Sequence, residues 1–256
     1  MTGRFALTGR VALISGGGTG IGRASALVLA QHGADLVLAG RRPQPLEDTA
    51  AEVRALGRRA VAVPCDVTSS EACAELVARA VAELGRLDIL VNSAGGAETK
   101  SVSKWTEDEW QQVLALNLGS VWNLSRFASK HMLAQGKGAI VNISSGASLL
   151  AMPQAAPYGA AKAAVNNLTG SLASAWTRKG IRVNAIAVGA VRAATLLDDA
   201  ARYGLDAEAI GMTNGSGRLG EPDEIGYGVL FFASDASSFC SGQTLYMHGG
   251  PGPAGV

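Results

Sequence analysis

The stretch Ser15-Gly-Gly-Gly-Thr-Gly-Ile-Gly22 decides the fold, because it follows directly on the apolar run Val11-Ala-Leu-Ile14 and opens a pattern with helical spacing. A strand-to-helix turn this rich in glycine allows positive φ angles and a close approach of the backbone to a ligand. The N-terminus of the following helix offers free N–H groups and a positive dipole end, which suit phosphate. We therefore expect a dinucleotide to contact Ser15, Gly16, Gly18, Thr19, Gly20, Ile21 and Gly22.

The same alternation of short apolar runs and longer helical patterns continues along the whole chain. Strands are predicted at 11–14, 35–38, 61–63, 87–91, 139–143, 183–186 and 243–247. Helices are predicted at 21–32, 45–56, 70–84, 106–134, 157–178 and 223–234. Strands that are apolar throughout are buried on both faces, and right-handed crossovers wind such a chain into an open sheet. We predict an α/β fold: a Rossmann-like, doubly wound parallel sheet with helices on both faces, in a single domain over residues 1–256.

Two segments carry further local signals. The long helix at 106–134 begins with Thr106-Glu-Asp-Glu109, a capping box. The least regular stretch, about 189–217, interrupts the alternation and is expected to be a flexible flap over the substrate.

The composition excludes several classes of protein. The 256 residues carry 22 Lys and Arg against 21 Asp and Glu, so the cation excess that nucleic acid or an anionic membrane requires is missing. No apolar run is long enough for a membrane span, and the N-terminal residues lack the apolar core of a signal peptide. The three cysteines form no CxxC pair and the three histidines are scattered, so we expect no metal site and a reducing, cytoplasmic location.

The second predicted strand distinguishes two kinds of cofactor. Gly16, Gly18 and Gly20 also match the G-x-G-x-G turn of methyltransferases that bind S-adenosylmethionine. A ribose diol, in that cofactor or in NAD, normally meets an acidic residue at the end of this strand. Here the strand ends Ala39-Gly-Arg-Arg42, and the planar guanidinium suits a phosphate. This favours NADP(H) over NAD(H), although Arg41 and Arg42 could also be a solvated pair at a helix start.

A possible proton-transfer pair follows Pro157, a residue favoured in the first turn of a helix. In Tyr158-Gly-Ala-Ala-Lys162 the spacing places the phenol and the ammonium on one helix face. A phenol of pKa about 10 is a poor proton shuttle at pH 7, and an adjacent fixed cation can lower that pKa. The Tyr-x-x-x-Lys spacing is common by chance, so it needs support from elsewhere in the chain.

That support comes from several motifs in one order. Together with the glycine turn and Tyr158/Lys162, Asn92-Ser-Ala-Gly95, Asn117 and Asn142-Ile-Ser-Ser145 make the chain, from about residue 7 to 250, resemble the short-chain dehydrogenase/reductase family. In that family the catalytic serine stands thirteen residues before the tyrosine, which selects Ser145 over Ser144. The resemblance implies a catalytic tetrad of Asn117, Ser145, Tyr158 and Lys162.

The resemblance also implies a cofactor site and a mechanism. Tyr158 exchanges a proton with the substrate oxygen, Ser145 holds that oxygen, Lys162 lowers the tyrosine pKa and holds the nicotinamide ribose, and Asn117 anchors a water. A homotetramer is usual in the family. Further cofactor contacts are implied for Asp66 and Val67 at the adenine, for Asn92, Ala94 and Gly95, and for Gly189 and Val191.

Departures from the family pattern leave alternatives open. Val188 replaces a common Pro, Ala193 a common hydroxyl residue and His248 a common Asp. A catalytically silent dinucleotide-binding relative therefore remains an alternative to an enzyme, as does the methyltransferase.

The substrate stays open among a 3-oxoacyl thioester, a steroid and a small carbonyl compound. An acidic carrier protein would need basic residues near the mouth of the site, for which Lys137, Arg178 and Lys179 are candidates. Leu149, Leu150 and Met152, between Ser145 and Tyr158, could form a substrate wall or pack in the interior.

Overall fold

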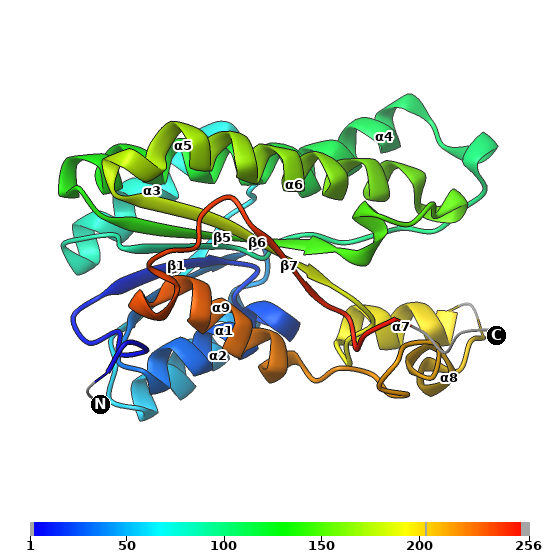
Figure 1. Ribbon diagram of the computed structural model, residues 1–256, viewed down its shortest axis with the longest axis horizontal. Coiled ribbons are helices and arrows are strands. Elements are labelled where there is room, and N and C mark those ends of the chain that lie inside the picture. The colour runs from blue at the N-terminus through cyan, green and yellow to red at the C-terminus, as the bar shows by residue number, and fades with distance from the viewer. Residues whose placement is uncertain (1–2, 203, 252–256) are drawn as a thin grey trace.

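The protein folds around one seven-stranded parallel sheet, as the computed structural model shows for residues 3–202 and 204–251 (Figure 1). The strand order is β3-β2-β1-β4-β5-β6-β7, and every pairing is parallel. The strands are β1 Val11–Ser15, β2 Asp35–Gly40, β3 Ala60–Pro64, β4 Ile89–Asn92, β5 Gly138–Ser145, β6 Ile181–Val188 and β7 Thr244–Met247. The predicted fold class is confirmed, and each strand begins and ends within two residues of its expected bounds.

Helices cover both faces of the sheet. On one side lie α1 Gly20–Gln31, α2 Pro43–Ala55 and α9 Pro222–Ala233, and on the other lie α3 Ser70–Leu84, α5 Ser120–Gln135 and α6 Ala156–Trp176 (Figure 1). In β1, Ala12 and Ile14 belong to the apolar core on the α1 side, whereas Val11 and Leu13 belong to the core on the α3 side. Burial on both faces explains why the strands are apolar throughout.

The winding of the chain reverses beside β1. This strand pairs with β2 on one side and with β4 on the other, so the segments that leave the carboxyl ends of β1 and β4 turn to opposite faces of the sheet. Ligands of open α/β sheets bind in the crevice at such a switch point. The glycine turn and the segment after β4 both start there.

The long helix predicted at 106–134 is divided in the structure. It begins as α4 Glu107–Leu114 with the expected capping box between Thr106 and Glu109, and continues as α5 after a π-helical turn, Ala115–Gly119. The side chain of Asn117 donates to the carbonyl of Val113 at 3.1 Å, the acceptor that its own backbone N–H would use in an α-helix. This competition favours the wider turn, which the hydrophobic spacing alone does not reveal.

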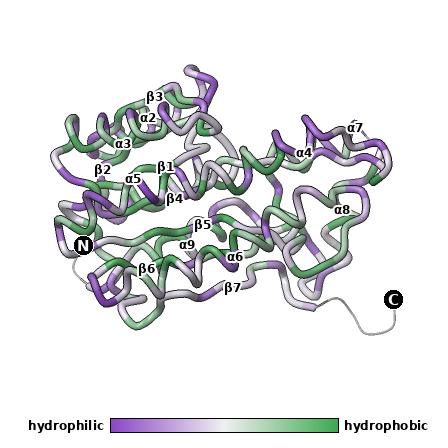
Figure 2. The backbone as a smooth tube through the Cα atoms, turned by 90° about the horizontal axis from the view of Figure 1, so that it is seen from above, coloured by the Kyte–Doolittle hydropathy of each residue, from purple (hydrophilic) through white to green (hydrophobic). Residues whose placement is uncertain are grey.

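The segment predicted as an irregular flap contains two helices, α7 Ala194–Arg202 and α8 Ala207–Gly211. Asp206 caps α8 by accepting from the backbone N–H of Glu208 at 2.9 Å. Arg192 pairs with Glu208, and its Nε donates to Glu221 at 2.9 Å. In both overall views α7 and α8 lie at the same end of the molecule as α4, the end to which the strands point their carboxyl termini (Figures 1 and 2).

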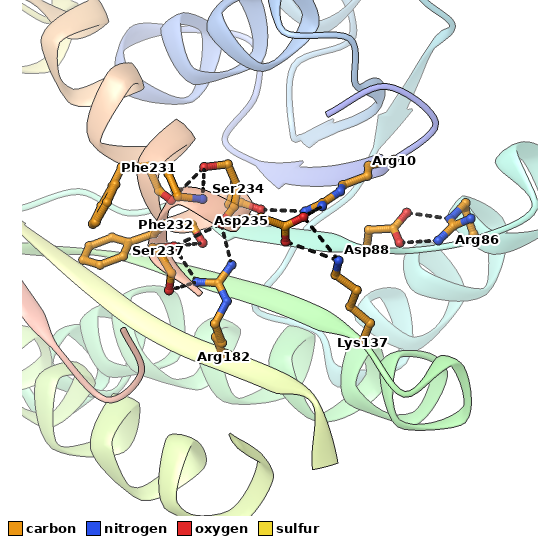
Figure 3. A network of polar contacts seen from close by, with 12 residues as sticks. Arg10, Arg86, Asp88, Lys137, Arg182, Phe231, Phe232, Ser234, Asp235 and Ser237 are labelled. Carbon is orange, nitrogen blue, oxygen red and sulfur yellow. Dashed lines mark hydrogen bonds and ion pairs between the residues drawn. The ribbon is translucent and has the colours of Figure 1, made fainter. Parts of the chain in front are cut away.

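Charged side chains connect the elements at the opposite end of the sheet, where the parallel strands begin; we call this end the amino edge and the other the carboxyl edge. Asp235 accepts from Arg10 and lies 3.2 Å from the Lys137 ammonium, while Arg182 donates to the Ser234 carbonyl at 3.0 Å (Figure 3). Arg10 and Arg182 thereby satisfy carbonyls at the end of α9, where a helix leaves its last acceptors free.

Candidate active site

The glycine turn after β1 is so tight that two of its glycines have no room for a side chain. Gly16 has a φ of +71°, and a Cβ there would lie 3.0 Å from the backbone N of Ala94. A Cβ on Gly22 would lie 2.1 Å from the carbonyl oxygen of Gly16. Any other residue at these positions would displace the turn, so glycine fixes its shape.

The N-terminus of α1 keeps its free N–H groups. Thr19 precedes the helix in an extended conformation but makes no side-chain cap hydrogen bond, and the first turn contains no acidic residue. An N-terminus without a cap has donors and a positive dipole end that an anion can use. That Thr19, Gly20 and Ile21 contact a pyrophosphate stays a prediction.

The Ser15 hydroxyl connects this turn to β4 rather than pointing to a ligand. Its oxygen accepts from the backbone N–H groups of Ser93 at 3.1 Å and Ala94 at 3.2 Å, and the side chain is buried. Asn92 acts similarly on the other side, where its Nδ2 donates to Asn142 at 2.8 Å. Both residues shape the crevice from within.

Asn117, in the π-helical turn that follows α4, contacts the segment after β4. The Asn117 Oδ1 accepts from the Gly96 N–H at 3.2 Å, and its Nδ2 donates to the Gly96 carbonyl at 2.9 Å. A Cβ on Gly95 would lie 2.8 Å from Asn117 Oδ1 and 3.3 Å from Lys162 Nζ. Asn117 Oδ1 and Lys162 Nζ therefore both lie close to Gly95, where a side chain would crowd them.

Ser145 and Tyr158 meet at the carboxyl end of β5. Ser145 is the last residue of that strand, and its Oγ accepts from the Ala147 N–H at 3.2 Å. Burial raises the pKa of Tyr158, and a side-chain hydrogen bond with Ser145 lowers it in part. The structure thus brings the tyrosine together with Ser145 and not with Ser144.

Lys162 lies one helical turn beyond Tyr158 in α6 and is buried. Its Nζ stands 5.5 Å from the centroid of the Tyr158 ring and donates to the carbonyl of Ile143 at 2.9 Å. Burial lowers the pKa of Lys162 to about 8. One of the three ammonium hydrogens is taken by Ile143, so the others can serve a ligand or a water. That Lys162 lowers the pKa of Tyr158 stays a prediction.

The end of β2 presents two exposed guanidinium groups. Within the part of the chain that the structure describes, neither Arg41 nor Arg42 forms an ion pair. Asp66, after β3, has its pKa lowered by hydrogen bonds from the backbone and hydroxyl of Thr68 and, more weakly, by the charge of Arg41. Arg41 and Asp66 therefore face the same region, where Val67 is buried.

The end of β6 approaches β7 closely. Gly189 donates its N–H to Met247 at 3.0 Å, and a Cβ on Gly189 would lie 2.7 Å from the Cα of His248. Val191 is buried and pairs with Gly220. Ala193 lies beside the glycine turn, since a Cβ on Gly20 would be 3.4 Å from its Cβ. Nothing in the structure explains why residue 248 is histidine.

Three leucine and methionine side chains after Ser145 are exposed. Leu149, Leu150 and Met152 retain 64%, 70% and 44% of their accessible surface, so they do not pack in the interior of this chain. Their segment is joined to the one after β4 by a hydrogen bond of 2.8 Å from Lys100 N to Gln154 O. Of the two possibilities for these side chains, the substrate wall is the one compatible with their exposure.

The basic residues considered for a carrier protein do not lie at this end. Lys137 directly precedes β5, and Arg178 and Lys179 lie in the 3₁₀ turn Thr177–Lys179 that precedes β6. Residues that precede parallel strands sit at the amino edge of a sheet, opposite the crevice. Their expected position near the mouth of the site is wrong.

Over residues 3–202 and 204–251, no group of three or more His, Cys, Asp or Glu side chains could hold a metal ion. Cys65, Cys73 and Cys240 are free thiols. Within the same ranges, none of the helices combines the length and the apolar character that crossing a membrane requires.

Comparisons with known proteins agree with the fold. A family model described as Enoyl-(Acyl carrier protein) reductase matches residues 16–251. A cis-4-hydroxycyclohexanecarboxylate dehydrogenase of Sinomonas cyclohexanicum is 39% identical over 245 residues, which are 94% of this chain and 96% of that protein.

Solved structures superpose over nearly the whole chain. A putative NAD(P)-dependent gluconate 5-dehydrogenase of Beutenbergia cavernae, with bound NADP at low occupancy, is 37% identical with a TM-score of 0.90 and covers 96% of this chain and 98% of its own. A 7α-hydroxysteroid dehydrogenase complexed with NADH and a 7-oxo bile acid is 32% identical, with a TM-score of 0.91 and 98% of both chains covered.

Proposed function

Since the chain belongs to the short-chain dehydrogenase/reductase family and is an oxidoreductase of that type, we propose that it interconverts a ketone and a secondary alcohol with NADP(H) as the preferred dinucleotide. The observation that carries the proposal is the convergence of Ser145, Tyr158 and Lys162 beside the glycine turn. Neither the methyltransferase nor the silent relative accounts for this group of side chains at the switch point.

The residues present fit a dinucleotide. The uncapped N-terminus of α1 and the tight turn at Gly16 and Gly22 form a cradle for the pyrophosphate, and Lys162 has ammonium hydrogens left for a ribose. When bound, the nicotinamide supplies the hydride to a carbonyl carbon or accepts it from an alcohol carbon. The protein positions the substrate and handles the proton.

Tyr158 is proposed as the group that exchanges the proton with the substrate oxygen. Ser145 already bonds the tyrosine, so an oxygen held between both hydroxyls is positioned for that exchange. The buried Lys162 ammonium stabilises the phenolate when the proton has left.

Asn117 is proposed to support the exchange of that proton with solvent. Its two amide hydrogens are used by the carbonyls of Gly96 and Val113, so only Oδ1 can accept from a water. Asn117 Oδ1 and Lys162 Nζ both lie close to Gly95, and a water that accepts from Nζ and donates to Oδ1 would join the two.

The preference for NADP(H) is supported by charge at the end of β2. The strand ends at Gly40 without a carboxylate, and the exposed Arg41 and Arg42 follow it without ion pairs in the described ranges. A phosphate on the adenosine ribose would gain charge-assisted hydrogen bonds from them, whereas a free diol would find no acidic acceptor at the end of β2.

For the substrate, we propose a free carbonyl compound with an apolar body. Exposed Leu149, Leu150 and Met152 offer hydrophobic contacts next to Ser145. The carrier-bound 3-oxoacyl thioester is less favoured, because Lys137, Arg178 and Lys179 lie at the other edge of the sheet.

A homotetramer is proposed as the assembly. It is supported by large side chains that stay exposed in the described part of the chain, two of them on the edge strand β7: Phe239, Tyr227, Leu245 and Tyr246. Sedimentation equilibrium tests this, and a monomer at micromolar concentration would contradict it.

The function is tested by binding first and turnover second. Thermal shift with NADPH and with NADH should show the larger stabilisation for NADPH, and the panel of ketones should then include substituted cyclohexanones, a steroid ketone and a polyhydroxy keto acid. NADPH oxidation should be fastest with the apolar ketones.

Stronger stabilisation by NADH would overturn the cofactor preference, and dinucleotide binding without turnover of any carbonyl would favour the silent relative. Binding of S-adenosylmethionine without NADPH binding would support the methyltransferase.

A further inference from the structure

Strand β5 carries two polar side chains, Asn142 and Ser144, that the proposed mechanism does not use. Both are buried, with 0% and 2% of their surface accessible. Side chains two residues apart on a strand share a face, and both of these contact α6, the helix that carries Tyr158 and Lys162. We call the hydrogen bonds Asn142–Thr169 and Ser144–Lys162 the β5–α6 seam.

The first bond of the seam has a fixed direction. The Thr169 hydroxyl donates its single proton to the Val165 carbonyl at 2.8 Å, so it must accept from Asn142 Nδ2, which lies 2.9 Å away. Asn142 Oδ1 in turn accepts from Asn92 Nδ2 at 2.8 Å. The amide of Asn142 therefore has one orientation, and it ties α6 to the centre of the sheet.

The second bond holds the backbone of the catalytic helix at Lys162. Ser144 Oγ donates to the Lys162 carbonyl oxygen at 3.2 Å, while Lys162 Nζ donates to the carbonyl of the preceding strand residue, Ile143, at 2.9 Å. Consecutive residues of β5 thus hold both ends of Lys162, its main chain and its ammonium.

Together the two bonds set the position of α6 along the strand. Thr169 lies about two helical turns beyond Lys162, so the bonds act at separate points on one helix face. A slide of the helix by one residue, about 1.5 Å, would break both bonds, whereas apolar contacts tolerate such a slide. Because Ser145 follows Ser144 and Tyr158 lies one turn before Lys162, the seam also sets how the two hydroxyls meet.

We propose that Ser144 and the Asn142–Thr169 pair are positioning residues, which keep the Lys162 ammonium buried beside the Tyr158 phenol. This proposal rests on the proposed function for its kinetic consequence, but not for its structural one. If the seam loosens, Lys162 gains solvent and moves from Tyr158, so the phenolate is less stabilised and alcohol oxidation needs a higher pH.

The test uses matched variants of the full chain. Ser144→Ala removes one bond of the seam, and Thr169→Val removes the other while keeping the shape of the side chain. Thr169→Ser keeps the hydroxyl, so it should retain the pH profile and the Lys162 titration of the unmodified protein. Ser129→Ala is the control, because Ser129 is also buried and donates to a carbonyl, that of Arg126 at 2.9 Å, in α5.

Two readouts separate positioning from simple stability. The first is the pH profile of kcat/KM for alcohol oxidation with NADP+. In Ser144→Ala and Thr169→Val the midpoint should rise by about half a unit, which lowers the rate about threefold below the midpoint and leaves the high-pH plateau unchanged.

The second readout needs no activity. In protein labelled with 13C-lysine, the Cε resonance of Lys162, assigned by its loss in Lys162→Met, should titrate near a pKa of about 8 in the unmodified chain. It should titrate higher in Ser144→Ala and Thr169→Val and stay in place in Thr169→Ser and Ser129→Ala.

Lower melting temperatures with both midpoints unmoved would overturn the proposal, since the seam would then only stabilise the fold. If the unmodified protein turns over no carbonyl, the proposed function fails, and the Lys162 titration still decides: a shift in the two variants supports the seam, and no shift overturns it.

Discussion

The two ends of the sheet differ in how completely the chain satisfies its own polar groups. At the amino edge, Asp88 accepts two hydrogen bonds of 2.7 Å from Arg86 and one of 2.9 Å from Val11 N, and Asp235 is shared by Arg10 and Lys137 (Figure 3). At the carboxyl edge, α1 lacks a cap, Arg41 and Arg42 lack ion pairs among the described residues, and large apolar side chains are exposed.

The contrast separates stability from binding. A cavity of about 310 Å³ lies at the amino edge, but Arg10, Asp88, Lys137 and Asp235, which line it, already pair with other groups of the chain. Unsatisfied hydrogen-bond donors and exposed apolar side chains lie instead at the carboxyl edge, where a bound ligand would contact them. Size alone therefore does not identify a site, and the end with the unmet interactions is the one expected to respond to ligands.

The largest effect at the carboxyl edge is expected from Gly22→Ala. Because the new Cβ would lie 2.1 Å from the Gly16 carbonyl, the turn must move. Dinucleotide affinity should fall by at least about 100-fold, as several backbone contacts are lost together. Isothermal titration calorimetry with NADPH measures this.

The matched control is Gly170→Ala in α6, where a Cβ meets nothing within 4 Å. It should bind NADPH normally and gain slight stability, since alanine favours a helix. Unchanged affinity in Gly22→Ala would show that the turn does not hold the dinucleotide.

A smaller effect is expected from Arg41→Ala. Loss of a charge-assisted hydrogen bond to a phosphate should weaken NADPH binding by about 30-fold, or about 2 kcal/mol, with NADH affinity almost unchanged. Arg178→Ala, an exposed arginine at the amino edge, serves as the control. Equal losses for NADPH and NADH would assign Arg41 a role other than reading the phosphate.

Leu150→Ser tests the proposed apolar contacts with the substrate at the carboxyl edge. Leu150 is 70% exposed, so folding should be unaffected, while the KM for an apolar ketone should rise about fivefold through lost burial, with kcat unchanged. Leu56→Ser, at an exposed leucine beyond α2, is the control in the same steady-state assay. An unchanged KM in Leu150→Ser would show that this side chain does not contact the substrate.

At the amino edge, Asp235→Asn should affect stability alone. Although burial raises the pKa of Asp235, hydrogen bonds and charge from Arg10 and Lys137 lower it overall. The carboxylate therefore stabilises the fold above its ordinary pKa of 3.8, and this contribution disappears as pH falls through the lower folded value.

The cost of Asp235→Asn in urea unfolding at pH 7 should be about 1 kcal/mol, kept small because water screens a side chain that is 46% exposed. The difference from the unmodified protein should shrink as the pH falls below 3.8 and vanish below the lowered pKa of the folded state. Altered kcat/KM at pH 7 would contradict the separation of the two ends.

The sequence predicts the strands, the glycine turn and the pairing of Tyr158 with Lys162 because each depends on local spacing. Prediction from the sequence fails where contacts between distant residues determine the local structure. The π-helical turn at Asn117 arises from side-chain bonds to Gly96 and Val113, and the helical pattern around it is unbroken.

Two other differences have simple physical causes. The helices α7 and α8 are short, with a capping aspartate at 206 as the local signal for the second. The placement of Lys137 follows from topology, since it precedes a parallel strand, a rule the sequence alone could have applied. The partners of Asn142 and Ser144 could not be predicted, because nothing local says which helix residue faces a strand.

The central claim is that Tyr158 exchanges the proton at the carboxyl end of the sheet. The most direct measurement compares kcat and the NADPH Kd of Tyr158→Phe with those of the unmodified protein, using its best ketone. We expect kcat to fall by at least about 1000-fold with the Kd changed less than about threefold, since the phenol acts only in the chemical step. An unchanged kcat would contradict the account.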